Sequence, residues 1–173
     1  MIILKFIQSL IKALHSDGTP GQVAAGIALG SILGLTPLMN PHNAVVFGSV
    51  VLLNVSFPGA MLGWALCIPV GFLLDPVFDR IGTLLLLETP GLVPLWTSIH
   101  NTPVLALSNF NNTIVLGSVV FAMAFLAPLF FGSRWAVARY RATVGERIRR
   151  SRLYKAVTAS KLYNLYRLFR PEG

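Results

Sequence analysis

The distribution of charge along the chain is the feature that most restricts how it can fold. Residues 18–74 contain no Asp, Glu, Lys or Arg over 57 consecutive positions, and residues 89–133 form a second charge-free run of 45 residues. Eleven of the 14 basic residues then lie within residues 134–173. A soluble domain needs charge on its surface, whereas charge is costly in hydrocarbon and Lys and Arg accumulate on the cytoplasmic side of membrane proteins. We therefore expect a multi-pass membrane protein.

The net charges of the polar segments predict its orientation. Residues 1–17 carry a net charge of +1, residues 75–88 carry −2 and residues 134–173 carry +9, in agreement with the +8 of the whole chain. Because positive charge marks the cytoplasmic side, both termini are expected in the cytoplasm and residues 75–111 on the opposite side. The basic tail is expected to contact lipid headgroups and not nucleic acid, since no nucleic-acid-binding module is recognisable.

The pattern of apolar residues predicts an all-α membrane protein with three regions. Residues 1–17 are expected to form an interfacial amphipathic helix, because apolar residues share one helical face and Lys5 and Lys12 lie opposite. Residues 18–133 form the expected membrane domain, and residues 134–173 the basic cytoplasmic tail, which is itself expected to be helical from Arg139 onward.

Proline and glycine divide the membrane domain into short apolar segments at residues 21–35, 44–56 and 59–74. The first segment would be roughly 22 Å long at ~1.5 Å per residue, against a hydrocarbon core of about 30 Å. We therefore expect short helical hairpins, which either thin the bilayer or re-enter it with their broken ends buried in protein. Residues 113–132 are expected to form the one full-length transmembrane helix.

Glycines recur at helical spacing in two of the short segments. Gly26, Gly30 and Gly34 lie one helical turn apart on one face, and Gly59 and Gly63 have the same spacing. In lipid, this spacing allows two helix backbones to approach closely, so these glycines predict helix packing and not chemistry. Replacing Gly30 by leucine should therefore disturb the fold more than the same change at Ile32, which lies on another face.

A few polar side chains interrupt the apolar sequence and are the candidates for a polar site: Asn40, His42, Asn43, Asn54 and Asp75. Residues 37–43 form a turn by composition, so the favoured interpretation is that their Asn side chains satisfy the broken helix ends. In the alternative, His42 and Asn43 line a site where half-helices meet and hold an ion or a headgroup.

Asp75 permits two interpretations as well. Asp75 and Asp79 are four residues apart and could share one helix face, where two carboxylates would suit acid–base work or cation binding. Arg80 stands beside them, however, and an ion pair is the simpler expectation.

Catalytic and metal-binding patterns are absent from the sequence. The single Cys67 lies in an apolar run and has no cysteine partner, and no Cys/His cluster has metal-ligand spacing. We find no activated Ser or Cys, no phosphate-binding loop with Lys and no HExxH motif. The sequence therefore predicts a protein that is not an enzyme and that has no cofactor and no metal site.

The stretch from Ala25 to Leu38, followed by His42-Asn43 and by Asn54, resembles the bacterial membrane family catalogued as domain of unknown function 2062. Leu53 departs from that family, where a basic residue is often expected, so a role of that basic group would not transfer to this chain. The chain also resembles a smaller proteobacterial subgroup of this family in five further motifs: Leu74-Asp75-Pro76, Pro94-Leu95-Trp96-Thr97, Asn101-Thr102-Pro103, Phe110-Asn111-Asn112-Thr113 and Ser133-Arg134-Trp135.

The resemblance implies an inner-membrane location and no assigned activity. Members of the subgroup tend to be encoded beside a larger envelope protein, which implies a two-protein assembly. We therefore expect a non-catalytic inner-membrane subunit that partners a larger envelope protein in lipid or envelope homeostasis, although the glycine face is equally compatible with a homo-oligomer.

The alternative function is a small transporter or channel with discontinuous helices and a polar site near His42 and Asn43. A polar cavity that is open to solvent at the hairpin tips would favour the transporter. A dry, packed core at the same place would favour the subunit.

Overall fold

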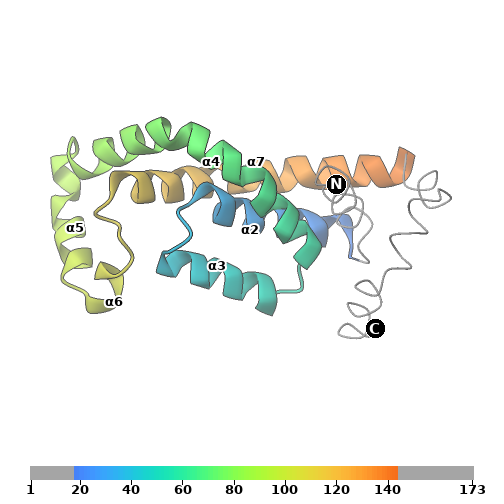
Figure 1. Ribbon diagram of the computed structural model, residues 1–173, viewed down its shortest axis with the longest axis horizontal. Coiled ribbons are helices and arrows are strands. Elements are labelled where there is room, and N and C mark those ends of the chain that lie inside the picture. Colours follow the sequence, from blue (N-terminus) through green and yellow to red (C-terminus); the bar gives the residue numbers. More distant parts are fainter. Residues whose placement is uncertain (1–17, 144–173) are drawn as a thin grey trace.

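The computed structural model describes residues 18–143, so the expected helices within residues 1–17 and 144–173 lie outside the described residues. Every regular element in the described part is helical and none is a strand, which confirms the all-α class. In chain order (Figure 1) the elements are α2 (Pro20–Leu35), α3 (Pro41–Leu52), α4 (Phe57–Leu86), the 3-10 helix η1 (Pro90–Leu92), α5 (Val93–His100), α6 (Pro103–Ala106) and α7 (Thr113–Thr143).

Two helices, α4 and α7, are long and apolar enough to cross a membrane. They contain 30 and 31 residues, and their most apolar windows have mean hydropathies of 1.8 and 2.5. Only 28% of each window is buried inside the protein, so most of its apolar surface is free to face lipid. Each helix is roughly 45 Å long at ~1.5 Å per residue, which exceeds the thickness of a hydrocarbon core.

The expectation of one full-length span, with a separate short segment over residues 59–74, is therefore wrong. Helix α4 continues through Asp75 and Pro76 and also contains Pro69. A proline removes one backbone hydrogen bond and bends a helix, but a membrane helix tolerates this because neighbouring groups satisfy the freed carbonyl. Figure 1 shows α4 bending along its course instead of ending. Helix α7 likewise contains Pro128 and extends through Arg134 to Thr143.

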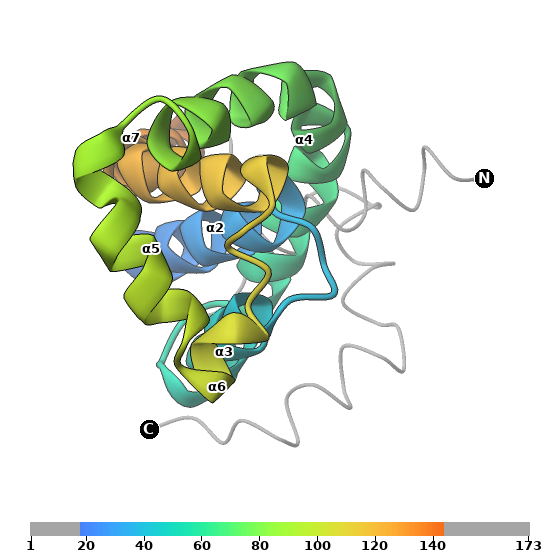
Figure 2. The same ribbon diagram turned by 90° about the vertical axis from the view of Figure 1, so that its left-hand side faces the viewer.

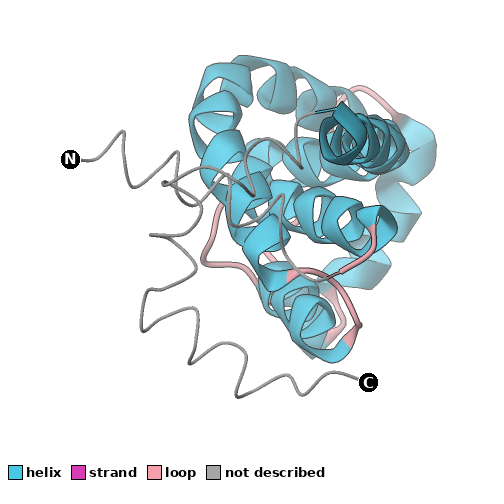
Figure 3. Cartoon of the chain, turned by 90° about the vertical axis from the view of Figure 1, so that its right-hand side faces the viewer, coloured by secondary structure: helices cyan, strands magenta, loops and turns pink. Residues whose placement is uncertain are grey.

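Helix α2 lies against both long helices and completes a three-helix core. Ile32 and Leu35 of α2 form a buried cluster with Phe78 of α4 and Ala122 of α7. Figure 2, viewed along the bundle, shows α2 beside α7 with α4 alongside. Figure 3 gives the opposite end view, in which short loops join the helices.

Two hydrogen bonds bring distant parts of the chain together at one end of the bundle. The backbone N–H of Ser56 donates to the Gln22 carbonyl at 3.0 Å, and the Arg141 guanidinium donates to the Gly18 carbonyl at 2.7 Å. The start of α2, the start of α4 and the end of α7 therefore lie together, whereas α5 and α6 lie at the other end (Figure 1). Helices α2 and α3 consequently form a hairpin that leaves this end and returns to it.

Glycines allow α2 and α4 to lie with their backbones in contact. A Cβ added to Gly30 would overlap the carbonyl oxygen of Ala60, and one added to Gly63 would overlap that of Ile27. A Cβ on Gly34 would lie 2.6 Å from the Trp64 carbonyl oxygen. Gly26 and Gly59 occupy equivalent places against the carbonyl oxygens of Ser56 and Val23. This crossing thus has no room for any side chain.

A second crossing of the same kind joins α4 to α7. A Cβ on Gly82 would overlap the Thr113 carbonyl oxygen, and one on Gly117 would overlap that of Phe78. Neither glycine has a second glycine four residues away, so no local sequence pattern marks either one. These two positions fix where the long helices cross.

Candidate functional site

The turn between α2 and α3 is held by its own polar side chains. The side-chain amides of Asn43 and Asn40 both donate to the Pro37 carbonyl, at 2.8 and 2.9 Å. The Thr36 hydroxyl lies 2.8 Å from both the Asn43 side-chain oxygen and the Ile32 carbonyl. Its single hydrogen can serve one of these acceptors at a time. Asn40 and Asn43 therefore close the turn through hydrogen bonds to its own backbone and to Thr36.

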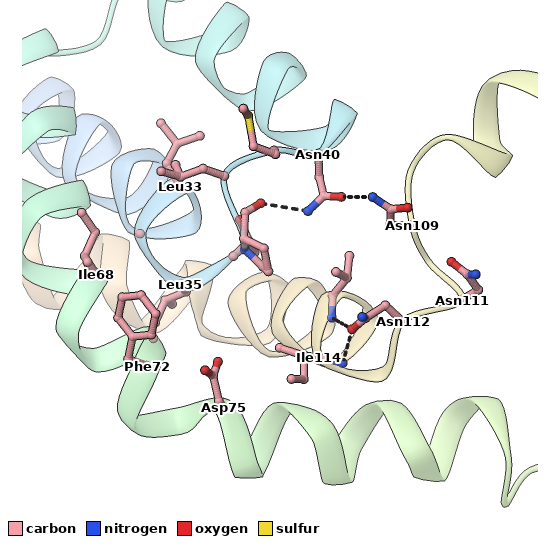
Figure 4. A pocket seen from close by; sticks show the side chains of 17 residues that line it. Leu33, Leu35, Asn40, Ile68, Phe72, Asp75, Asn109, Asn111, Asn112 and Ile114 are labelled. Atoms are coloured by element: carbon pink, nitrogen blue, oxygen red, sulfur yellow. Dashed lines mark hydrogen bonds between the residues drawn. The ribbon is translucent and has the colours of Figure 1, made fainter.

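The loop before α7 contacts this turn. The Asn109 side-chain amide donates to the side-chain oxygen of Asn40 at 2.9 Å, and Asn109 itself has a φ of 55°, a conformation that asparagine tolerates. The side-chain oxygen of Asn112 accepts hydrogen bonds from the backbone N–H groups of Ile114 and Val115, at 2.9 and 3.2 Å, and so caps α7 (Figure 4). In the sequence, this loop is marked by three asparagines within four residues, Asn109, Asn111 and Asn112, directly before an apolar span.

The turn, the middle of α4 and the start of α7 enclose a cavity of about 880 Å³ that is open to the outside of the protein. Its volume lies within the range of small-molecule sites, about 300–1,000 Å³. Apolar side chains form much of its wall. The polar side chains that line it are Thr36, Asn40, Asp75, Asn109, Asn111 and Asn112.

Asp75 is the one charged side chain among the described residues that line this cavity. It is half-buried, and Figure 4 shows its carboxylate directed from α4 toward the turn. Within residues 18–143 no hydrogen-bond donor or cation contacts this carboxylate. Asp75 is therefore an ionisable group with unused hydrogen-bonding capacity in a cavity wall.

The expected ion pair of the aspartates with Arg80 is wrong. Arg80 instead pairs with Glu88 at 2.6 Å, and Asp79 accepts a hydrogen bond from the Thr113 hydroxyl. Positions five residues apart lie on different faces of a helix, so the Arg80 side chain is not a neighbour of Asp75. The two carboxylates of α4 consequently have different surroundings.

The remaining candidates lie away from the Asp75 cavity. His42 stacks on Phe110 with ring centroids 6.4 Å apart, and both its ring nitrogens are buried without a hydrogen-bond partner in the described chain. This residue lies outside the two candidate spans, and burial lowers the pKa of its imidazole, which favours the neutral ring. Asn54 is exposed between α3 and α4, at the far end of the hairpin. The structure thus brings Asn40 and Asp75 to one cavity and separates His42 and Asn54 from it.

Metal binding finds no support in the described residues, where no group of three or more His, Cys, Asp or Glu side chains could hold an ion. The chemistry available at the cavity is that of one carboxylate, one hydroxyl and several amides. Such groups can bind and orient a polar ligand through hydrogen bonds and charge.

Comparison with known proteins identifies the family. The family model described as an uncharacterized protein conserved in bacteria (DUF2062) matches residues 4–144, and the chain belongs to this family. An uncharacterized protein of Treponema pallidum (strain Nichols) is 24% identical over 163 residues, which cover 92% of this chain and 98% of that protein. No solved structure matches the chain. The expected family resemblance is confirmed, whereas the proteobacterial subgroup and its neighbouring envelope protein stay predictions.

Proposed function

We propose that the chain is a multi-pass protein of the bacterial inner membrane that binds an organic cation at Asp75, as a small transporter or channel would. The observation that carries this proposal is the Asp75 carboxylate in the wall of an open cavity at the hairpin turn, where no donor or cation from residues 18–143 contacts it. An open cavity at this place, with a carboxylate and several amides in a largely apolar wall, supports a transporter over a purely structural subunit. Ionisable residues within membrane helices are costly, and they commonly mark ligand or ion pathways.

The geometry of the cavity supports an organic ligand over a bare metal ion. A divalent metal such as Ca²⁺ needs about six to eight oxygen ligands at roughly 2.3–2.6 Å, whereas this cavity of about 880 Å³ offers one carboxylate and a few amide oxygens, of which those of Asn40 and Asn112 already accept hydrogen bonds. An ammonium group is a more suitable partner, because it donates hydrogen bonds to a carboxylate in a charge-assisted contact. The remaining volume accommodates the organic part of the ligand.

Replacing Asp75 by asparagine should remove this cation binding. Ethylammonium chloride should raise the free energy of unfolding of the purified protein by about 1.4 kcal/mol over the value in potassium chloride of equal ionic strength. This value applies when the ethylammonium concentration is ten times the dissociation constant of the ethylammonium complex. The Asp75→Asn protein should lose the difference between the two salts, because its neutral amide cannot attract the cation. Equilibrium unfolding in mixed micelles measures the effect.

Asp79→Asn is the matched control, since it makes the same substitution one helical turn further along α4 at an exposed carboxylate. This variant should keep the response to ethylammonium. Equal stabilisation of the unmodified protein by both salts, or an unchanged response in Asp75→Asn, would contradict the proposed cation site.

We also propose that the α2–α3 hairpin re-enters the bilayer from the cytoplasmic side. Helix α2 has 16 residues and is roughly 24 Å long, too short to cross comfortably beside α4 and α7. Its last turn lies in the buried cluster with Ala122 of α7, and the turn that follows hydrogen-bonds to Asn109 in the loop before α7, so the shortness of α2 is the feature that supports re-entry. The net positive charge of residues 134–173 supports a cytoplasmic location for the end from which the hairpin starts.

Cysteine accessibility in a Cys67→Ser background tests this topology. A cysteine at Asn54 or Thr143 should react with a membrane-impermeant maleimide only after the cytoplasmic side is exposed. A cysteine at Gly91, where an added Cβ meets no atom within 4 Å, should react in intact spheroplasts. Labelling of residues 54 and 91 from the same side would reject the arrangement.

The hypothesis of a non-catalytic subunit that partners a larger envelope protein in lipid or envelope homeostasis stays a prediction. Self-association stays a prediction as well. Neither hypothesis conflicts with a ligand-binding cavity, because a subunit of a larger assembly can itself bind a solute.

A further inference from the structure

A second cavity lies beside the Asp75 cavity, and its walls are mostly apolar, with Asn40 and Asn43 at the end nearest the turn. It has a volume of about 550 Å³ and lies between α3 and the first part of α4. Phe47, Phe57, Met61 and Trp64 contribute to its walls, and no charged side chain of the described residues lines it. We call this space the α3–α4 groove. Away from the two asparagines, its lining suits an apolar chain.

The two spaces adjoin at the hairpin turn. Leu33, Leu38, Met39 and Asn40 line both the Asp75 cavity and the α3–α4 groove. A space with one carboxylate and several amides in its wall thus lies next to a mostly apolar space, and the hairpin turn forms part of the wall of each. A single ligand that occupies both must have a polar end and an apolar end.

We infer that this ligand is a membrane phospholipid whose headgroup carries an ammonium group, with the headgroup at Asp75 and an acyl chain in the α3–α4 groove. The inference rests on the proposed cation site and specifies the class of its ligand. It explains why a carboxylate site at the hairpin turn adjoins a mostly apolar space.

Charge complementarity selects the headgroup. Among the described residues, neither cavity is lined by Lys, Arg or His, so Asp75 supplies the only full charge. An anionic headgroup would meet this carboxylate with like charge, whereas an ammonium group donates charge-assisted hydrogen bonds to it. The amide of Asn111, which makes no hydrogen bond within residues 18–143, can donate to an oxygen of the lipid phosphate.

The acyl chain positions the lipid but does not select it. Moving a chain from the bilayer into an apolar groove gains little, because lipid tails are as apolar as the groove wall. Discrimination between phospholipids must therefore come from the headgroup and from Asp75. This separation of roles makes the inference testable, since acyl-chain contact and headgroup preference can be measured independently.

Tryptophan quenching by brominated lipids tests both parts. A Trp96→Phe/Trp135→Phe protein retains only Trp64 in the groove, and is placed in nanodiscs of equal parts phosphatidylethanolamine and phosphatidylglycerol. In one sample the first lipid carries brominated chains, and in the other sample the second lipid does. We expect quenching of Trp64 to report a two- to fivefold preference for phosphatidylethanolamine. This preference corresponds to about 0.4–1 kcal/mol, which is the contribution of one partly exposed ion pair.

Three variants complete the experiment. Asp75→Asn should abolish the lipid preference of Trp64 while quenching itself persists, and Asp79→Asn should leave the preference unchanged. A Trp64→Phe/Trp96→Phe protein retains Trp135, which is 69% exposed on α7, and should be quenched equally by both lipids. Absence of Trp64 quenching, equal quenching by both lipids, or a preference that survives Asp75→Asn would overturn the inference. If ethylammonium still binds at Asp75 in that case, the proposed cation site stands and only the lipid assignment falls.

Discussion

Replacing Gly30 by leucine should lower the free energy of unfolding by about 3 kcal/mol or more, the upper end of the usual effect of overpacking. The reason is geometric, because a Cβ at this position already overlaps the carbonyl oxygen of Ala60. A backbone carbonyl cannot move aside as a flexible side chain can, so α2 and α4 must separate. Equilibrium unfolding in mixed micelles measures the change, and the yield of monodisperse protein in mild detergent gives an independent readout.

Gly48→Leu is the matched control for this experiment. Gly48 also lies within a helix, α3, but an added Cβ there meets no atom within 4 Å. Leucine is a better helix former than glycine by about 1 kcal/mol, so this control should be neutral or slightly stabilised. Ile32, which the sequence offered as a tolerant comparison, is only 7% exposed and belongs to the buried core, and it is therefore unsuitable. Equal stability of Gly30→Leu and Gly48→Leu would contradict the close crossing of α2 and α4.

Replacing Gly117 by leucine should have an effect of similar size at the other crossing. A Cβ on Gly117 overlaps the Phe78 carbonyl oxygen, so α7 must move away from α4. Even Gly117→Ala, which adds one methyl group, should destabilise the protein by about 1–3 kcal/mol, because the overlap involves the Cβ itself. Unfolding of both variants in mixed micelles measures these values.

Gly132→Leu provides the control on the same helix, since an added Cβ there meets no atom within 4 Å. Separation of α4 from α7 also displaces two walls of the Asp75 cavity, which both helices line. Gly117→Ala should therefore weaken ethylammonium binding as well, whereas Gly132→Leu should leave it unchanged. Tolerance of leucine at position 117 would show that the two long helices do not cross at this glycine.

The helical class and the membrane character followed from local properties of the chain. A run of 57 residues without charge has few alternatives to an apolar environment, whatever its tertiary contacts. The boundaries of α4 could not be predicted from local properties of the chain. Proline is a strong local signal for the end of a helix, yet α4 passes through Pro69 and Pro76, because a helix that packs along two partners can bend at a proline without ending.

The candidate site was predictable only in its components. Asn40 and Asp75 stood out as polar residues in apolar sequence. Because 34 residues separate them, no local pattern predicted that they line the same cavity. His42 and Asn54 stood out equally and lie elsewhere. Asn109 contacts Asn40 across 69 residues of sequence, and no local pattern connects the two.

The sequence by itself determined which segments avoid water, which end of the chain carries the positive charge, and that glycine lies at the α2–α4 crossing, because hydropathy, charge and residue size act locally. Only the tertiary structure decided that Arg80 pairs with Glu88 while Asp75 meets no donor or cation from the described part of the chain. It also decided that isolated Gly82 and Gly117 form a second crossing and that the Asp75 cavity adjoins the α3–α4 groove. These features depend on which helix faces meet, and that choice is made by the packing of the whole bundle and not by any one segment.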